Sequence, residues 1–266
     1  MPFRAQNSNK GTFGKVLNFA GSKNYIGASY LSALSVLKSG AGFVALATEP
    51  EVIKIVSSML PEAVYYTRNE ALKYKNQFTV VIIGCGLGLS NKSKNIFKKV
   101  VRLYNKSEIP FIIDADGLNI LSEIKKINLP KNTVITPHPM EASRLLGLKL
   151  GDVLNNLEEC AKELSRKYSC VTVLKTHRTI IYDNKTGEVF VNQHGNSALA
   201  KAGSGDVLTG IIGGLTAQKM PLFEACKLGV YLHSRAGELA SENLTEYSVL
   251  ASDLPNYLHL AISELI

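Results

Sequence analysis

The sequence predicts an α/β protein in which helices cover both faces of a central, mostly parallel sheet. Short runs rich in β-branched residues alternate with amphipathic stretches along most of the chain, and one hairpin interrupts this alternation. Such alternation is typical of β-α units, which build parallel sheets. No linker, low-complexity tract or internal repeat divides the 266 residues. We therefore expect one three-layer α/β/α domain over residues 1–266, with a small β-hairpin extension.

The strands are predicted from apolar, β-branched runs that are too short for helices and are bounded by turn-forming residues. These runs are Val16–Ala20, Phe43–Ala47, Val64–Thr67, Thr79–Ile83, Phe111–Asp114, Thr133–Thr136 and Val171–Lys175.

The helices are predicted from apolar residues that recur every three or four positions. They are Ile26–Lys38, Glu51–Met59, Ser93–Tyr104, Met140–Leu146, Leu154–Tyr168, Asp206–Gln218, Leu222–Asn243 and Ala251–Leu265.

The hairpin is predicted from two short strands, Thr179–Tyr182 and Val189–Val191, which bracket the turn Asp183–Gly187. It delivers the chain to a glycine-rich loop. Because ligands of open α/β sheets bind outside the carboxyl ends of the strands, we expect the loops that follow the strands to meet at one edge and to carry the site.

The composition, with 45% hydrophobic and 20% charged residues, fits a globular enzyme and excludes a disordered chain. Lys and Arg number 30 against 22 Asp and Glu, which gives a net charge of +8. This excess favours anionic ligands such as polyphosphates. The lysines form only short clusters without interleaved aromatic residues, so we expect no nucleic-acid partner.

The four cysteines are scattered and form no Cys-x-x-Cys pair, which argues against a zinc site or a disulfide framework. We predict reduced, mostly buried thiols at Cys85, Cys160, Cys170 and Cys226. No apolar run reaches the roughly 18 residues of a membrane span, and the polar start of the chain lacks a signal-peptide core. The prediction is a cytoplasmic protein with no membrane partner.

The stretch Gly195–Gly210 carries the strongest functional signal. Gly203 and Gly205 let backbone amides approach a ligand closely, and the helix that opens near Asp206 points its unpaired N–H groups at the same place. A phosphate fits there. The helix dipole favours an ionised Asp206 that accepts a proton from a substrate hydroxyl. An N-capping Asp after a loop explains the same spacing equally well, so both interpretations stay open.

Three further segments have a functional and a structural interpretation. Gly84–Gly88 follows a predicted strand and lacks the Rossmann spacing, so a plain turn competes with a close approach to a ligand. His138 stands between two prolines that fix the backbone, although a lone His is often structural. Glu141 falls in the first turn of the next helix, where the dipole alone stabilises a carboxylate.

Two more segments are equally ambiguous from local sequence. Lys175–Thr179 offers a cation, hydroxyls and amides for a phosphate, but a surface hairpin entry would look much the same. Asp114 and Asp116 can both reach a ligand at a strand end, where a metal is one possibility, yet Asp is common in turns. The glycines of Ser39–Gly42 also suit a helix C-terminus.

Taken together, these motifs resemble the NAD(P)H-hydrate dehydratase branch of the ribokinase-like superfamily, along nearly the whole chain. The family commonly has Pro where Cys85 stands and Gly where Met140 and Thr176 stand, so the chain departs from the pattern there. The matching pieces are Asn9–Gly11, Gly14–Val16, Gly21–Ser22, Tyr25–Ala28, Ser39–Gly42, Gly84–Gly88, Asp114–Asn119, Thr136–Glu141 and Gly195–Gly214.

The resemblance implies a ribokinase-like fold and a role for each matching residue, with Asp206 as the catalytic base. The implied substrate-binding residues are Ala41, Gly86, Gly88, His138 and Asp206. The implied nucleotide-binding residues are Lys175, Thr176, His177, Arg178, Thr179, Asn196, Gly203, Ser204 and Gly205. Glu141 is implied to hold Mg²⁺ through water.

The activity that the resemblance implies is repair of hydrated NADH and NADPH by a lyase. ADP phosphorylates the ring hydroxyl, giving AMP, and phosphate is then eliminated; eukaryotic members use ATP. Mg²⁺, a homotetramer and functional coupling to an NAD(P)H-hydrate epimerase are implied as well, and we expect no epimerase domain within this chain. A small-molecule kinase of the hydroxyethylthiazole kinase type and a non-catalytic nucleotide-binding regulator remain the alternatives.

Overall fold

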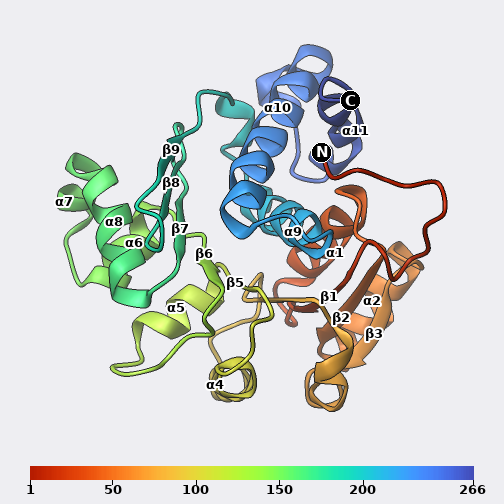
Figure 1. Ribbon diagram of the computed structural model, residues 1–266, viewed down its shortest axis with the longest axis horizontal. Coiled ribbons are helices and arrows are strands. Elements are labelled where there is room, and N and C mark those ends of the chain that lie inside the picture. Colours follow the sequence, from red (N-terminus) through yellow and green to blue (C-terminus); the bar gives the residue numbers. More distant parts are fainter.

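The computed structural model describes residues 1–266 and contains one nine-stranded sheet of order β3-β2-β1-β4-β5-β6-β7-β8-β9 (Figure 1). Neighbouring strands from β3 to β7 run parallel, whereas β8 is antiparallel to β7 and β9 is antiparallel to β8. All nine predicted strands are confirmed, each to within one residue at either end. Their bounds are β1 (Lys15–Phe19), β2 (Phe43–Thr48), β3 (Val64–Thr67), β4 (Val80–Ile83), β5 (Phe111–Ile113), β6 (Thr133–Ile135), β7 (Val171–Leu174), β8 (Ile180–Asp183) and β9 (Val189–Val191).

The sheet changes its winding direction at β1. The chain proceeds outward from β1 through β2 to β3, then crosses to β4 on the other side of β1 and continues to β9. Phe19, at the end of β1, pairs with Ala47 on one side and Ile83 on the other, so these strands finish at a common level. The loops after β1 and β4 therefore begin side by side at this switch point, where the Gly21 N–H donates to the Cys85 carbonyl at 2.8 Å, and ligands of open α/β sheets usually bind at such a point.

Two layers of helices enclose the sheet, as the β-α alternation predicts (Figure 1). The helices α4, α5, α6 and α8 pack on one face, and α1, α9 and α10 on the other, with α11 packed against α10. The bounds are α1 (Ile26–Lys38), α2 (Pro50–Met59), α3 (Arg68–Ala71), α4 (Asn91–Tyr104), α5 (Asp116–Ser122), α6 (Pro139–Leu146), α7 (Leu150–Asn155), α8 (Leu157–Tyr168), α9 (Ser204–Ala217), α10 (Leu222–Ser248) and α11 (Leu254–Ser263), with 3₁₀ helices η1 (Leu72–Gln77) and η2 (Ser197–Leu199).

The buried core follows the alternation of side chains along the strands. Phe111 and Phe97 belong to the cluster on the α4 face, whereas Ile82 and Ile212 belong to the cluster on the α9 face, and all four are fully buried. Because both faces of the sheet are covered, the strands are apolar on both sides. None of the helices combines the length and the apolar character that crossing a membrane requires.

The helix expected over Leu154–Tyr168 is wrong as one element. The chain forms α7 and α8 instead, with Asn156 between them in a non-helical conformation (φ −139°, ψ 46°). The short helices α3 and α5 and the 3₁₀ helix η1 were not predicted, since an element of one or two turns is too short to show helical periodicity.

Candidate active site

The loop before α9 makes a sharp turn that places the start of this helix at the carboxyl edge of the sheet. Gly203 is the N-cap of α9 and has φ 93°, a left-handed conformation that glycine adopts without steric cost. The N–H groups of Gly205 and Asp206 lie in the first turn, where no carbonyl of the helix can accept them. The predicted glycine turn into a helix is confirmed, and it presents free donors to an anion.

Asp206 occupies the third position of α9 and does not cap it: the N-cap is Gly203, and no side chain caps the helix. The interpretation of Asp206 as an N-capping residue is therefore wrong. One carboxylate oxygen of Asp206, the Sγ of Cys85 and one carboxylate oxygen of Asp114 all lie within 4.8 Å of one another. The Asp206 side chain points into the site and toward the ends of β4 and β5.

The surroundings of Asp206 make it a weaker acid. Burial, and next the negative charge of Asp114, raise the pKa of Asp206 to about 7, while the Cys85 thiol and Lys175 act in the opposite direction. The ionisation of Asp206 that the helix dipole favours is therefore only partial near neutral pH, because desolvation and a like charge oppose the dipole. A general base works best when its pKa lies near the working pH.

A buried ion pair lies beside the first turn of α9. The Nζ of Lys175, just after β7, is 2.6 Å from Oδ1 of Asp114, just after β5. The hydroxyl of Thr209 on α9 donates to Oδ2 of Asp114 at 2.7 Å. A Cβ added at Gly205 would lie 3.3 Å from the Lys175 Nζ, so the ammonium group touches the helix start. The predicted nucleotide residues Lys175 and Gly205 are therefore brought together.

The donor set at this position, Cys85, Asp114 and Asp206, leaves only the Asp206 carboxylate as a hard oxygen donor for Mg²⁺. Cys85 is a soft donor, and both oxygens of Asp114 are already bound by Lys175 and Thr209. Mg²⁺ prefers hard oxygen ligands and retains several waters when it bridges phosphates. A Mg²⁺ ion here would have to be held mainly by the phosphates of a nucleotide, and a contact of Glu141 with its water shell stays a prediction.

His138 and Glu141 cap the start of α6 together. The Nδ1 of His138 accepts hydrogen bonds from the N–H groups of Met140 and Glu141, and the Oε2 of Glu141 accepts from the His138 N–H at 2.9 Å. The predicted place of Glu141 in the first helical turn is confirmed. Burial first, with a smaller effect of Asp114, raises the pKa of Glu141 to about 7. Its Oε2 is 3.9 Å from Lys175, so this cap adjoins the ion pair.

The turn between β7 and β8 carries the remaining predicted phosphate contacts. Within it, the hydroxyl of Thr176 donates to the Arg178 carbonyl at 2.7 Å, and the hydroxyl of Thr179 donates to the Thr176 carbonyl at 3.1 Å. His177 and Arg178 are exposed, whereas Thr179 is buried. The turn accommodates Thr176 in place of the family's glycine, because the Thr176 hydroxyl forms a hydrogen bond within the turn.

The loop that precedes α9 is anchored on α10 by side chains that sequence reasoning did not single out. The Gly195 N–H donates to Oε1 of Glu238 at 2.6 Å, and the Asn196 side chain donates to the Ser241 hydroxyl at 2.7 Å. Ser204 lies at the other end of the loop, where its hydroxyl is 2.9 Å from Nε2 of His233. The loop is therefore held at both ends by one helix.

The glycines predicted to bind substrate lie against the loop that follows β1. A Cβ added at Gly86 would lie 2.6 Å from the Cβ of Tyr25, and one at Gly88 would lie 3.3 Å from the hydroxyl of Ser22. Both contacts are with the loop after β1. The structure does not bring Ala41 to this site: it precedes Phe43, which begins β2 at the opposite, amino edge of the sheet. Its predicted substrate contact has no support in this geometry.

Arg68, at the start of α3, links the loops after β1 and β4 and was missed because nothing in its sequence neighbourhood marks it. Its guanidinium group donates to the carbonyl oxygens of Gly21 and, at 3.0 Å, of Leu87. It also forms an ion pair of 3.3 Å with Glu49 and contacts the Ser93 hydroxyl. The side chain is only 9% exposed, so the contacts of its two terminal nitrogens offset much of the cost of burying the charge, while Nε has no partner.

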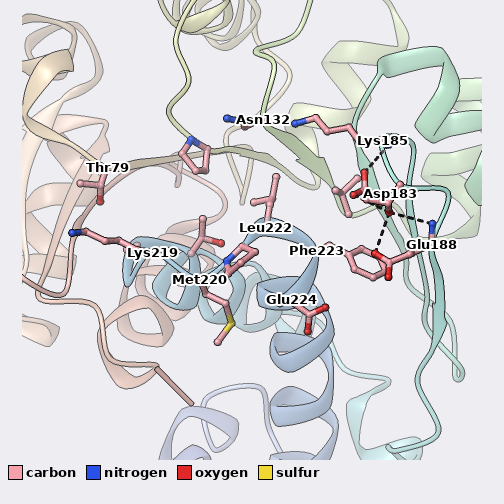
Figure 2. A pocket seen from close by; sticks show the side chains of 16 residues that line it. Thr79, Asn132, Asp183, Lys185, Glu188, Lys219, Met220, Leu222, Phe223 and Glu224 are labelled. Atoms are coloured by element: carbon pink, nitrogen blue, oxygen red, sulfur yellow. Dashed lines mark hydrogen bonds between the residues drawn. The ribbon is translucent and has the colours of Figure 1, made fainter. Parts of the chain in front are cut away.

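A separate cavity of about 550 Å³ opens at the amino edge of the sheet, away from Asp206 (Figure 2). Pockets of this size are often binding sites, but here the polar side chains bind one another. Lys185 donates to Oδ1 of Asn132 at 2.8 Å, and Thr186 donates to Glu188 at 3.1 Å. The two carboxyl groups whose pKa values are raised to about 7, those of Asp206 and Glu141, lie at the carboxyl edge instead. This identifies the carboxyl edge as the candidate active site.

The fold and the site together define an enzyme-like protein of the ribokinase-like class. A solved ribokinase-like superfamily protein from Enterococcus faecalis superposes with a TM-score of 0.90 at 31% identity, covering 99% of this chain and 92% of that one. Within this class, the chain belongs to the NAD(P)H-hydrate dehydratase family, which matches residues 16–260.

Several relatives are similar along nearly the whole chain. An ADP-dependent (S)-NAD(P)H-hydrate dehydratase from Neisseria meningitidis is 36% identical, covering 90% of this chain and 81% of its own length. An ADP/ATP-dependent NAD(P)H-hydrate dehydratase from Bacillus subtilis, co-crystallised with ATP and Mg²⁺, superposes with a TM-score of 0.89 at 30% identity, covering 100% of this chain and 95% of that one.

A bifunctional NAD(P)H-hydrate repair enzyme from Coxiella burnetii is 38% identical over 99% of this chain. The match covers 53% of that relative's length, so the chain spans about half of the bifunctional enzymes that it resembles.

Proposed function

We propose that the chain dehydrates the hydrated forms of NADH and NADPH, using ADP as phosphoryl donor and producing AMP and phosphate. The main support for this proposal is the position of Asp206, a carboxylate with a pKa of about 7 that lies next to free helix amides and the Lys175 ammonium. Family membership supports this substrate, and the name of the Neisseria relative supports ADP. Coupling to an epimerase is proposed from the bifunctional relatives.

Phosphorylation makes the dehydration feasible. In the hydrated cofactor, a hydroxyl sits on the carbon next to the ring nitrogen. Hydroxide leaves poorly, since the pKa of water is about 15.7, whereas phosphate has a second pKa of about 6. A site that transfers a phosphoryl group to this hydroxyl therefore converts a poor leaving group into a good one.

Asp206 begins the reaction by accepting the proton of the ring hydroxyl. The hydroxyl oxygen bonds to the terminal phosphorus of ADP, and the bond from that phosphorus to the oxygen of AMP breaks. The amides of Gly205 and Asp206, together with Lys175, stabilise the charge on the transferred group. Mg²⁺, when bound with the nucleotide, neutralises phosphate charge.

Elimination then completes the repair. The lone pair of the ring nitrogen expels phosphate as the carbon–oxygen bond breaks, and the adjacent ring carbon loses a proton. The double bond of the dihydronicotinamide is restored. The net products are NADH or NADPH, AMP and phosphate.

The test mixes the protein with hydrated NADH, Mg²⁺ and either ADP or ATP, and follows the return of the reduced-nicotinamide absorbance. We expect Asp206→Asn to lower turnover about a thousandfold and to bind ADP with nearly unchanged affinity. Asp152→Asn, which alters an exposed carboxylate on α7, serves as the matched control with full activity. Near-normal turnover by Asp206→Asn would eliminate Asp206 as the base.

Product analysis separates the alternative functions. A small-molecule kinase would release a stable phosphorylated product, and a non-catalytic regulator would bind nucleotide without forming AMP or phosphate. Either result would refute the dehydratase proposal.

A further inference from the structure

Asp114 stands at the centre of the site, although from the sequence it was interpreted only as a possible metal ligand or a turn residue. Its side chain is 1% exposed, and it connects three separate elements. Oδ1 accepts from Lys175 after β7, and Oδ2 accepts from Thr209 on α9 and lies 3.9 Å from the Sγ of Cys85 after β4. A buried carboxylate with both oxygens engaged in this way has one fixed position.

The bond to Asp114 determines where the Lys175 ammonium lies. With Asp114 at 2.6 Å, the Nζ rests against Gly205 at the start of α9. The other carboxylate near Lys175 is Glu141 on α6, at 3.9 Å. Without the charge of Asp114, the ammonium would turn toward Glu141 and away from the amides that receive an anion.

Asp114 also keeps a negative charge beside Asp206. Burial works to raise the pKa of Asp114, but the charge of Lys175 and hydrogen bonds from Lys175 and Thr209 lower it overall. Its carboxylate and that of Asp206 have oxygens within 4.8 Å of each other. Two carboxylates this close in a buried site do not ionise independently.

The other charged and titratable groups that face Asp206 have smaller or opposing effects. Asp116 at the start of α5 adds a further negative charge, whereas Lys175 and the thiol of Cys85 act in the opposite direction on the pKa of Asp206. Among these groups, Asp114 exerts the largest effect of any charge.

We propose that Asp114 is a positioning residue with two actions: it holds the Lys175 ammonium against the first turn of α9, where a phosphate binds, and its fixed negative charge makes Asp206 basic enough to deprotonate a hydroxyl near neutral pH. The proposal rests on the proposed function only for what Asp206 deprotonates. Its two physical consequences are a higher titration midpoint of Asp206 and a Lys175 ammonium held at the start of α9. Both can be measured without turnover.

The experiment is NMR titration of protein labelled with ¹³C at the aspartate carboxyl groups. The chain has only six aspartates, and the signal lost in Asp206→Asn identifies Asp206. In the unaltered protein we expect this signal to titrate near pH 7. In Asp114→Asn we expect the midpoint to fall by about one pH unit, and calorimetry to show ADP binding weakened about tenfold.

Two further variants complete the test. Asp183→Asn removes another buried carboxylate, in β8 at the amino edge of the sheet, and should leave both measurements unchanged. Lys175→Met removes the cation that opposes Asp114, so the midpoint of Asp206 should rise. This variant keeps the test decisive if Asp114→Asn does not fold.

An unchanged Asp206 midpoint in a folded Asp114→Asn variant, or an unchanged midpoint in Lys175→Met, overturns the electrostatic action. Unchanged ADP affinity in Asp114→Asn overturns the placement of Lys175. Failure of the unaltered protein to dehydrate hydrated NADH refutes the proposed function, but the titration and the binding measurement still decide the role of Asp114.

Discussion

Gly210 of α9 lies directly against the backbone of Ser32 on α1, so that a Cβ at Gly210 would be 2.3 Å from the Ser32 carbonyl oxygen. The two helices pack extensively, and α9 carries Asp206 one turn before Gly210. Because a backbone carbonyl cannot rotate aside, Gly210→Ala must push the helices apart. We expect a loss of about 2 kcal/mol in the free energy of unfolding and a loss of activity, measured by urea unfolding and the dehydration assay.

Gly151→Ala in α7 is the matched control for this substitution, because a Cβ there meets no atom within 4 Å. Alanine favours helix over glycine by about 0.5–1 kcal/mol, so this variant should be slightly more stable and fully active. Equal stability of the two variants would show that the close packing of α9 on α1 is not required.

Activity should rise with pH through about 7, the pKa of Asp206, because the base must be ionised to accept a proton. Below this value kcat/KM should fall tenfold for each pH unit. Glu141 has a similarly raised pKa, so Glu141→Gln distinguishes the two groups. If the fall of kcat/KM below pH 7 disappears in Glu141→Gln, the titrating group is Glu141 and not Asp206.

Asp206→Asn should stabilise the protein, more strongly at pH 8 than at pH 5. The folded-state pKa of about 7 exceeds the ordinary value of 3.8. Ionised Asp206 therefore destabilises the fold increasingly as pH rises from about 4 to 7, and fully above 7. After allowing for partial exposure, we expect Asp206→Asn to raise the free energy of unfolding by about 2 kcal/mol at pH 8. The same gain at both pH values would contradict the raised pKa.

Arg68→Lys should raise the KM for the hydrated cofactor about tenfold and leave ADP affinity nearly unchanged, because one ammonium cannot hold both Gly21 and Leu87 as the guanidinium fork does. Separate titrations of the two substrates check this. Arg102→Lys on the exposed side of α4 is the control. Equal loss of affinity for both ligands would indicate general destabilisation instead.

The native protein should resist iodoacetamide, because all four cysteines are free and buried. Burial raises the pKa of Cys85 well above its usual range and that of Cys170 to about 12, so both are protonated thiols. Intact-mass measurement should show no adduct in the folded protein and four adducts after unfolding without reductant. Labelling of the folded protein at Cys85 would show that the site opens.

The local sequence pattern alone was sufficient to predict the strands and most of the helices. Runs such as Val64–Thr67 and Ile26–Lys38 were predicted with the bounds that the structure shows, because burial on one or both faces leaves a readable apolar period. The glycine turn at Gly203 was likewise predictable, since few other residues adopt its φ. By contrast, the boundary between α7 and α8 at Asn156 depends on local conformation that leaves no periodic signal.

The sequence by itself determined the order of strands and helices, the edge of the sheet where the loops meet, and the position of Asp206 in a glycine-led helix. Only the tertiary structure decided how basic Asp206 is, that Asp114 joins Lys175 to Thr209, and that Ala41 lies at the far edge. The reason is physical: periodicity and turn chemistry act between neighbours in the chain, whereas desolvation and Coulomb interaction depend on which distant residues meet.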